Sequence, residues 1–120
     1  TAKLIDLYPP SAAYPFGYAL NLTDSIMRLR YRNSPETSQF LPPGEIGQLT
    51  ITLYPTSNLF TTGHRIRLDI SSSNFPRFDV NPNTGDTIGS ERRRNLADNT
   101  VHHSRDYPSH VKLPIIPNCV

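Results

Sequence analysis

Three of the four histidines lie close together in the sequence, at His102, His103 and His110. Histidine nitrogens bind zinc well, so a folded loop could bring these rings to one metal ion. However, no cysteine or glutamate stands among them at a convincing ligand spacing. We therefore expect these histidines to bond to backbone or to serve an interface, with zinc binding as the weaker alternative.

Oxygen-bearing side chains recur at alternate positions in Asp79, Asn81 and Asn83, and Asp86 follows closely. Oxygen ligands at positions 1, 3 and 5 are typical of the start of a calcium-binding loop. The glycine and glutamate that an EF-hand needs later in the loop each come one residue late. Asparagine, proline and glycine also form ordinary turns. The sequence favours a turn, and a free-standing carbohydrate- or calcium-binding β-sandwich remains the alternative function.

Three consecutive serines, Ser71, Ser72 and Ser73, could supply a nucleophile. Nothing close in the sequence adds a base and an oxyanion hole, and the serines continue a predicted strand. The chain also lacks a Gly-x-Ser-x-Gly elbow, a Gly-x-Gly-x-x-Gly fingerprint, a Walker loop and a His-Glu-x-x-His helix. We therefore assign no catalytic residue and expect no cofactor.

Charge and hydropathy exclude further classes of protein. The formal net charge is only +2, and Tyr31 alternates onto the face opposite Arg28, Arg30 and Arg32, so nucleic-acid binding is not expected. No apolar run approaches the roughly 18–20 residues of a membrane helix. The single cysteine, Cys119, excludes an intrachain disulfide. One cysteine and no visible signal segment are compatible with a cytoplasmic protein.

The elements that must position these residues are short strands. Apolar and polar residues alternate most cleanly around Leu29, Ile51 and Leu68, which indicates strands with one buried face. Twelve prolines in 120 residues favour short strands joined by long loops. We expect strands at residues 2–8, 17–22, 27–32, 48–53, 65–70 and 111–116.

Residues 74–110 show little periodicity and predict one long loop excursion, with a possible helical turn at 91–97. The excursion mixes aromatic, basic and histidine side chains, a composition suited to an interface. The interdomain contact candidates are Phe75, Arg77, Phe78, His102, His103, Tyr107 and His110. Six strands barely supply two layers, so we expect an all-β sandwich or jelly roll that is incomplete at its N-terminus.

The run from residue 63 to 85, GHRIRLDISSSNFPRFDVNPNTG, strongly resembles the C-terminal domain of the X-Pro dipeptidyl-peptidase and CocE/NonD family of serine hydrolases. Segments 2–10, 19–32, 43–60 and 108–117 fit the same family in the same order. The resemblance therefore spans practically the whole chain. Val80 and Tyr107 depart from the family, which usually carries Arg and often His at these positions.

The resemblance implies a galactose-binding-like jelly roll over residues 1–120, without its first strands. It also implies a parent enzyme whose Ser-His-Asp triad lies in a preceding α/β-hydrolase domain and cleaves esters, amides or X-Pro peptides. No family motif that carries a catalytic residue occurs here, so none is transferred. The expected role is a non-catalytic domain that packs on the catalytic domain and helps shape its cleft. Self-association through uncovered strand edges is also expected.

Overall fold

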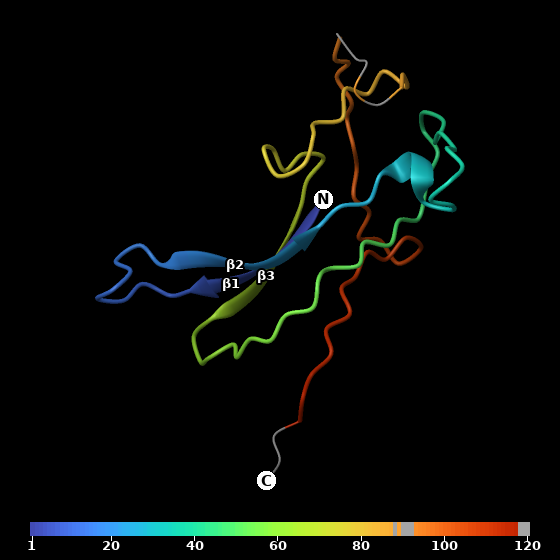
Figure 1. Ribbon diagram of the computed structural model, residues 1–120. Helices are drawn as coiled ribbons and strands as arrows, with labels where there is room; N and C mark the ends of the chain where they lie inside the picture. The colour runs from blue at the N-terminus through green and yellow to red at the C-terminus, as the bar shows by residue number, and fades with distance from the viewer. Residues whose placement is uncertain (88, 90–92, 118–120) are drawn as a thin grey trace.

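The computed structural model describes residues 1–87, 89 and 93–117. Its sheet is antiparallel, with the strand order β2-β1-β3 (Figure 1). The regular elements are β1 (Ala2–Tyr8), β2 (Tyr18–Ser25), the 3-10 helix η1 (Leu29–Tyr31) and β3 (Arg65–Ile70). The predicted all-β class is confirmed, and the three strands form one layer of the expected sandwich.

The predictions at 2–8, 17–22 and 65–70 are confirmed by β1, β2 and β3. The β1–β2 hairpin requires Gly17, which has φ +78°, because a Cβ there would lie 2.7 Å from the Tyr8 carbonyl oxygen. A bulge between Leu4 and Ile5 shifts the register of this pair. The hairpin therefore fixes the register of two strands before the long loops begin.

The predicted strand at 27–32 is wrong, because the chain forms η1 there. The Tyr31 amide donates to the Arg28 carbonyl at 2.9 Å, which closes a helical turn. The Arg32 guanidinium then donates to the Gln39 carbonyl at 2.8 Å and stabilises the turned backbone. These local hydrogen bonds prevail over the alternating pattern, for which the described part of the chain offers no pairing strand.

The predicted strands at 48–53 and 111–116 are also wrong: neither segment joins a ladder in the part of the chain that the structure describes. The first is held beside the sheet by a side chain instead, since the Thr23 hydroxyl donates to the Tyr54 carbonyl at 2.9 Å. The second contains Pro114, which has no N–H to donate. Both segments run as irregular loops.

The core is small and lies on β1. Ala2, Leu4 and Ile5 are the buried apolar residues of the described ranges. The radius of gyration is 17.6 Å. A compact domain of this length would have about 14 Å, so these loops do not close over the sheet.

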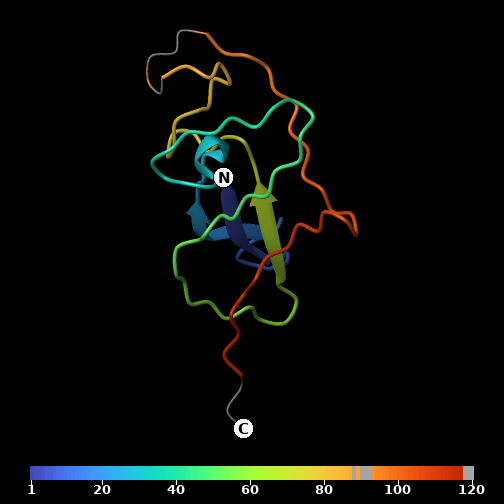
Figure 2. The ribbon, with the colours of Figure 1, turned by 90° about the vertical axis from the view of Figure 1, so that its right-hand side faces the viewer.

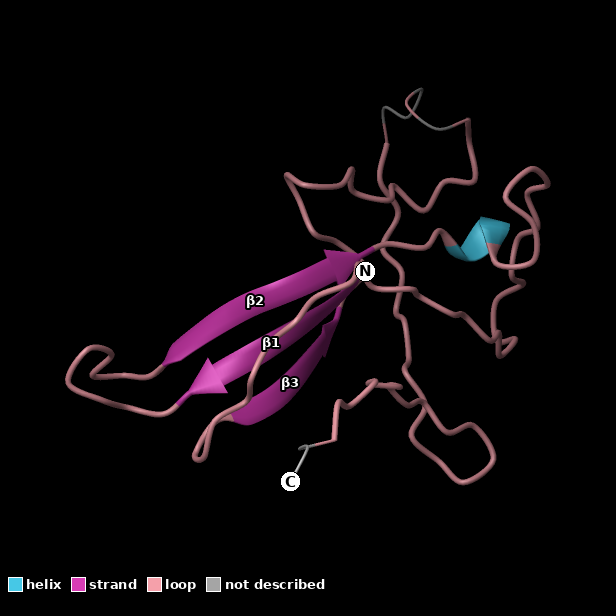
Figure 3. Ribbon diagram, turned by 60° about the horizontal axis from the view of Figure 1, so that its bottom comes forward, coloured by secondary structure: helices cyan, strands magenta, loops and turns pink. Residues whose placement is uncertain are grey.

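The long excursion is confirmed at 74–110, where the described residues contain no helix and no strand beyond an isolated bridge between His103 and Pro108. It extends away from the sheet and then returns towards the C-terminus (Figures 1 and 2). Of the predicted helical turn, residues 91 and 92 lie outside the described residues, and 93–97 are not helical. Figure 3 shows how much of the chain is loop around the single sheet.

None of the helical structure in the described residues has the length and apolar character needed to cross a membrane.

Candidate interdomain interface

A buried polar cluster, formed by Asp6, Asn58 and His64, fastens the chain before β3 to the middle of β1. The Asp6 side chain is inaccessible to solvent. Its Oδ1 lies 2.8 Å from His64 Nδ1, and its Oδ2 accepts a hydrogen bond from Asn58 Nδ2 at 3.1 Å. The Tyr8 ring packs on the imidazole at a centroid distance of 4.2 Å. Both carboxylate oxygens are therefore used to hold chain segments together.

The sequence interpretation missed this cluster. Its only signal is one aspartate inside the apolar run LIDLY, where a charge would need a partner once buried. The partners come from 52 and 58 residues further along the chain. No local spacing rule could therefore have identified them.

A second cluster, the loop anchor, consists of Asp24, Asn74 and Arg77 and fixes the start of the excursion to the end of β2. Asp24 is buried. Its Oδ1 pairs with Arg77 Nε at 2.8 Å, and its Oδ2 accepts from Asn74 Nδ2 at 3.2 Å. Arg77, expected to be an interdomain contact, thus makes its ion pair within the chain. Phe75 lies between the two anchored residues and is 72% exposed.

An open groove of about 720 Å³, the arginine groove, lies between η1 and the loop anchor. Its lining combines apolar side chains with three guanidinium groups and one carboxylate. Phe78 lies half-buried beside Arg77, whose guanidinium carbon is 5.6 Å from the ring centroid. The lining residues are Ile26, Met27, Arg28, Tyr31, Arg32, Asn33, Ser34, Pro35, Arg77, Phe78 and Asp79.

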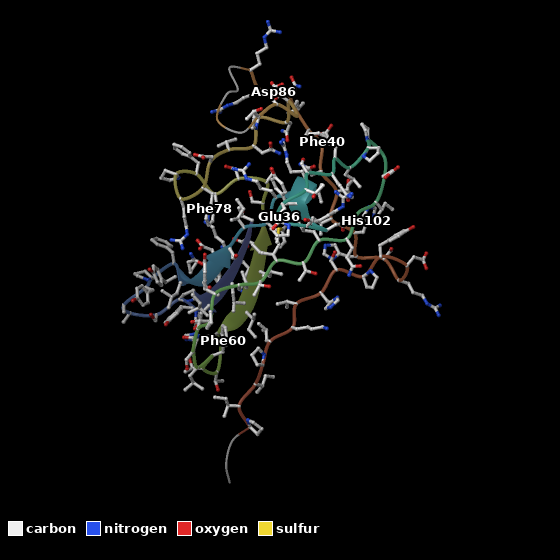
Figure 4. All side chains as sticks on the ribbon, turned by 45° about the vertical axis from the view of Figure 1, so that its right-hand side comes forward. Glu36, Phe40, Phe60, Phe78, Asp86 and His102 are labelled. Carbon is white, nitrogen blue, oxygen red and sulfur yellow. The ribbon has the colours of Figure 1, made fainter. Side chains whose placement is uncertain are left out.

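The turn at η1 is what brings these arginines into the groove. In the predicted strand, Arg28, Arg30 and Arg32 would share one solvated face. In the structure, Arg28 and Arg32 line the groove, whereas Arg30 faces another hollow. Arg30 lies over the Phe40 ring at 4.9 Å and donates to the Asp86 carbonyl at 3.2 Å. Figure 4 shows Phe40 and Asp86 near one another at the end of the molecule remote from Phe60.

Of the candidate calcium residues, Asn81 and Asn83 form a turn, whereas Asp79 and Asp86 line two separate hollows. Asn81 Nδ2 donates to Asn83 Oδ1 at 2.9 Å, and the Asn83 amide donates to Asn81 Oδ1 at 3.2 Å. Asn83 has φ +58°, a conformation that asparagine tolerates in turns. Asp79 lines the arginine groove, whereas Asp86 lines the smaller hollow beside Phe40. This arrangement favours the turn interpretation.

No group of three or more histidine, cysteine, aspartate or glutamate side chains is arranged to hold a metal ion in the ranges that the structure describes.

The predicted histidine residues belong to a tight reversal of the chain at 102–110, the histidine tip. The bridge between His103 and Pro108 closes the reversal, and His110 Nδ1 lies 3.2 Å from the Pro108 carbonyl oxygen. The His102 and Tyr107 rings pack at a centroid distance of 5.5 Å. Half of Tyr107 remains exposed. The tip therefore exposes aromatic and imidazole rings, and the bridge between His103 and Pro108 holds its backbone in place.

The predicted contact residues fall into two groups that the structure does not bring together. Phe75, Arg77 and Phe78 lie at the loop anchor, and the four others form the histidine tip. Figure 4 shows the labelled Phe78 and His102 on opposite sides of the ribbon. Any interface that uses the whole set must therefore touch the domain at two places.

Comparison with known proteins identifies the domain type. Residues 1–112 match the X-Pro dipeptidyl-peptidase C-terminal non-catalytic domain. Cocaine esterase from a Rhodococcus species is 42% identical over 118 residues, which cover 97% of this chain and 20% of that protein. Proteins from Mycobacterium bovis and Mycobacterium tuberculosis, named as candidate serine esterases, are each 38% identical over 76 residues, covering 63% of this chain and 10% of each protein.

No solved structure matches the chain at a significant level. The chain spans a fifth or less of the length of the curated relatives that it matches. The family match nevertheless covers nearly all of the chain, in agreement with the resemblance seen in segments 2–10, 19–32, 43–60 and 63–85. The chain belongs to the family of X-Pro dipeptidyl-peptidase C-terminal non-catalytic domains.

Proposed function

We propose that this domain serves a longer serine hydrolase of the CocE/NonD type, in which it packs on the catalytic α/β-hydrolase domain and helps shape the active-site cleft. The observation that carries the proposal is the similarity to cocaine esterase, which covers 97% of this chain but only 20% of the esterase. The parent reaction would be hydrolysis of an ester or amide. The nucleophile, base and oxyanion donors would come from the other part of the parent protein.

The docking surface in this proposal is Phe75 together with the arginine groove. Phe75 is held outward by anchored neighbours on either side, so little side-chain and loop entropy is lost when it is buried. Aromatic and arginine side chains are the commonest energetic anchors of protein interfaces. The catalytic domain would fill the groove with an apolar side chain and meet Arg28 and Arg32 with carboxylates.

The histidine tip would make a second, separate contact. Its exposed residues, Tyr107 and His103, stand on a reversal that is already closed by the bridge to Pro108. A loop that projects from the domain in this way can reach over a neighbouring cleft. This second contact is the part of the proposal through which the domain would influence substrate access.

The experiment produces the 120-residue chain and the remainder of the parent polypeptide as two chains, and measures their complex by size-exclusion chromatography and titration. Turnover of a p-nitrophenyl ester is measured for each chain and for the complex. We expect no turnover by the 120-residue chain and a stable complex. Phe75→Ala should weaken the complex about tenfold, as the loss of an interface anchor does.

Phe16→Ala is the matched control, because Phe16 is 99% exposed but lies on the β1–β2 hairpin, away from the groove. It should leave the complex unchanged. Equal effects of the two substitutions would refute the docking surface. Ester turnover by the 120-residue chain itself would refute the non-catalytic role.

A further inference from the structure

The arginine groove carries an excess of positive charge. Arg77 is paired with Asp24, with 2.8 Å between its Nε and the carboxylate Oδ1. The hydrogen bonds of Arg32 go to two backbone carbonyl oxygens, which are neutral. In the part of the chain that the structure describes, the half-buried side chain of Arg28 makes no ion pair or hydrogen bond. Asp79, the carboxylate of the lining, is exposed and balances only one of these two charges.

The remaining walls of the groove are largely apolar and aromatic. Met27, Tyr31 and Phe78 belong to the lining, and the two rings are half-buried. The volume of about 720 Å³ lies within the range of small-molecule sites, roughly 300–1,000 Å³. Such sites combine apolar walls with a few polar groups that orient the ligand. The groove therefore suits a small molecule with an apolar body and one anionic end.

The chemistry of the lining narrows this ligand to an aromatic carboxylate. A guanidinium group matches a carboxylate through two parallel N–H···O hydrogen bonds. An aromatic ring can pack edge-to-face on Tyr31 or Phe78, and the Met27 sulfur also favours aromatic neighbours. An inorganic anion would leave this apolar surface in contact with water.

We propose that the arginine groove binds aromatic carboxylates, with the carboxylate at Arg28 and Arg32 and the ring against Tyr31 and Phe78. The site is preorganised, because the Tyr31 amide donates to the Arg28 carbonyl at 2.9 Å and holds both residues in one turn of the chain. Hydrolysis of an ester or amide releases a carboxylate. The acid product of the parent reaction would therefore belong to this class when its acyl group is aromatic.

The consequence for docking rests on the proposed function, whereas binding to the isolated chain does not. In the proposed interface, the catalytic domain fills the groove with an apolar side chain and meets Arg28 and Arg32 with carboxylates. An aromatic carboxylate presents both features in one molecule, so it would compete with the catalytic domain for the groove. Released acid would then loosen the contact between the two domains.

A nuclear magnetic resonance titration of the 120-residue chain with sodium phenylacetate tests the binding. A ligand as small as this should have a dissociation constant on the order of 1 mM. The backbone amide signals of Tyr31 and Phe78 should shift. Phenylacetamide, which has the same shape without the charge, and acetate, which lacks the ring, should each bind at least about tenfold more weakly. No shift with phenylacetate, or equal binding of acetate as an adventitious anion only, would overturn the proposal.

Two arginine substitutions on the same turn separate the groove from general charge. Arg28→Gln should weaken phenylacetate binding at least about tenfold, because it removes a charge-assisted hydrogen-bond donor. Arg30→Gln removes the same charge but lies over the Phe40 ring in the other hollow, so it should leave the dissociation constant within about twofold. The amide spectrum of each variant without ligand confirms that the sheet is retained. Equal effects of the two substitutions would overturn the site.

The competition is measured on the complex of the 120-residue chain with the rest of the parent polypeptide. Phenylacetate at ten times its dissociation constant should raise the dissociation constant of the complex about tenfold. Acetate at the same concentration keeps the ionic strength and should not. The complex of the Arg28→Gln chain should not respond to phenylacetate, which excludes an effect through the catalytic domain alone.

The outcomes separate the two proposals. A complex that phenylacetate does not weaken, although the isolated chain binds it, would overturn the competition. The absence of any complex would refute the docking function and with it the competition. Binding to the isolated chain would still stand or fall on its own titration.

Discussion

Strands β1 and β3 are neighbours in one sheet, paired residue by residue, yet their surroundings differ sharply. β1 has an irregular pattern, AKLIDLY, and is buried over most of its length, including the carboxylate of Asp6. β3 has a perfect alternation, RIRLDI, and lies largely exposed on both faces. Leu4 and Leu68 stand directly opposite each other, at 5% and 37% exposure.

The difference teaches that alternation identifies the apolar face of a strand but not what covers it. The central strand β1 has neighbouring side chains on both flanking strands, and Asp6 is also covered by Asn58 and His64. An edge strand depends on an additional layer or strand for its burial. In this domain, the strand with the clearest pattern, β3, has only β1 as a ladder partner among the described residues.

The largest expected effect on the free energy of unfolding comes from comparing the loss of a buried aspartate on β1 with the loss of an exposed one on β3. Asp6→Ala leaves His64 and Asn58 without their buried acceptor and should lower the free energy of unfolding by about 3 kcal/mol. Asp69→Ala removes an exposed ion pair and should cost the monomer about 0.5 kcal/mol. Urea unfolding measures both, at a dilution that keeps the chain monomeric. Similar costs would mean that the two strands are equally buried.

The next contrast uses the same side chain on both strands. Leu4→Ala should cost about 2 kcal/mol, the lower end of a core leucine truncation, because this core is small. Leu68→Ala should cost the monomer less than about 1 kcal/mol, since its side chain is already partly exposed. The comparison is again made by urea unfolding. A larger effect at Leu68 would show that β3 is covered within the chain.

A smaller effect is expected at the loop anchor. Asp24→Ala should cost about 1 kcal/mol, because one partner, Arg77, is more than half exposed and can return to water. Limited proteolysis should then cut the chain near residues 74–78 faster. Asp24→Asn, which keeps an acceptor for Asn74, is the matched control and should be cut more slowly than Asp24→Ala. Equal cutting of the original chain and Asp24→Ala would show that the anchor does not hold the loop.

The smallest effect concerns the former calcium candidates. Because the amide oxygens of Asn81 and Asn83 already accept hydrogen bonds within the turn, added calcium should leave the thermal unfolding temperature unchanged. Asn83→Ala removes the hydrogen bond that Asn83 Oδ1 accepts from Asn81 and strains a positive φ, and should cost about 1 kcal/mol. A calcium-dependent rise in the unfolding temperature that Asn83→Ala abolishes would restore the metal-binding alternative.

The sequence predicted the class of the fold, the three strands of the sheet and the length of the excursion, because these depend on local periodicity and proline content. It did not predict η1, since the Arg32 hydrogen bond to the Gln39 carbonyl competes with strand formation only once the chain turns. The segments at 48–53 and 111–116 have strand-like patterns but no ladder partner in the described residues. A segment forms a strand only where a neighbouring segment accepts and donates its backbone hydrogen bonds.

The residues expected to make interdomain contacts were chosen by residue type, which does not indicate their arrangement. Phe75 is exposed, as expected of an interface anchor, whereas Arg77 is engaged by Asp24. This long-range ion pair joins residues 53 positions apart in the sequence, which no pattern in a short window reveals. The family resemblance supplied what local patterns could not, namely the type of domain to which these strands belong.

The central claim is that Phe75 and the arginine groove are covered by the rest of the parent protein. The measurement is the rate of thiol labelling of Phe75→Cys in a Cys119→Ser background, in the isolated chain and in the full-length parent. We expect rapid labelling in the isolated chain and labelling at least about tenfold slower in the parent, as for a buried interface anchor. Phe16→Cys should be labelled rapidly in both. Equal rates for Phe75→Cys in the two proteins would contradict the account.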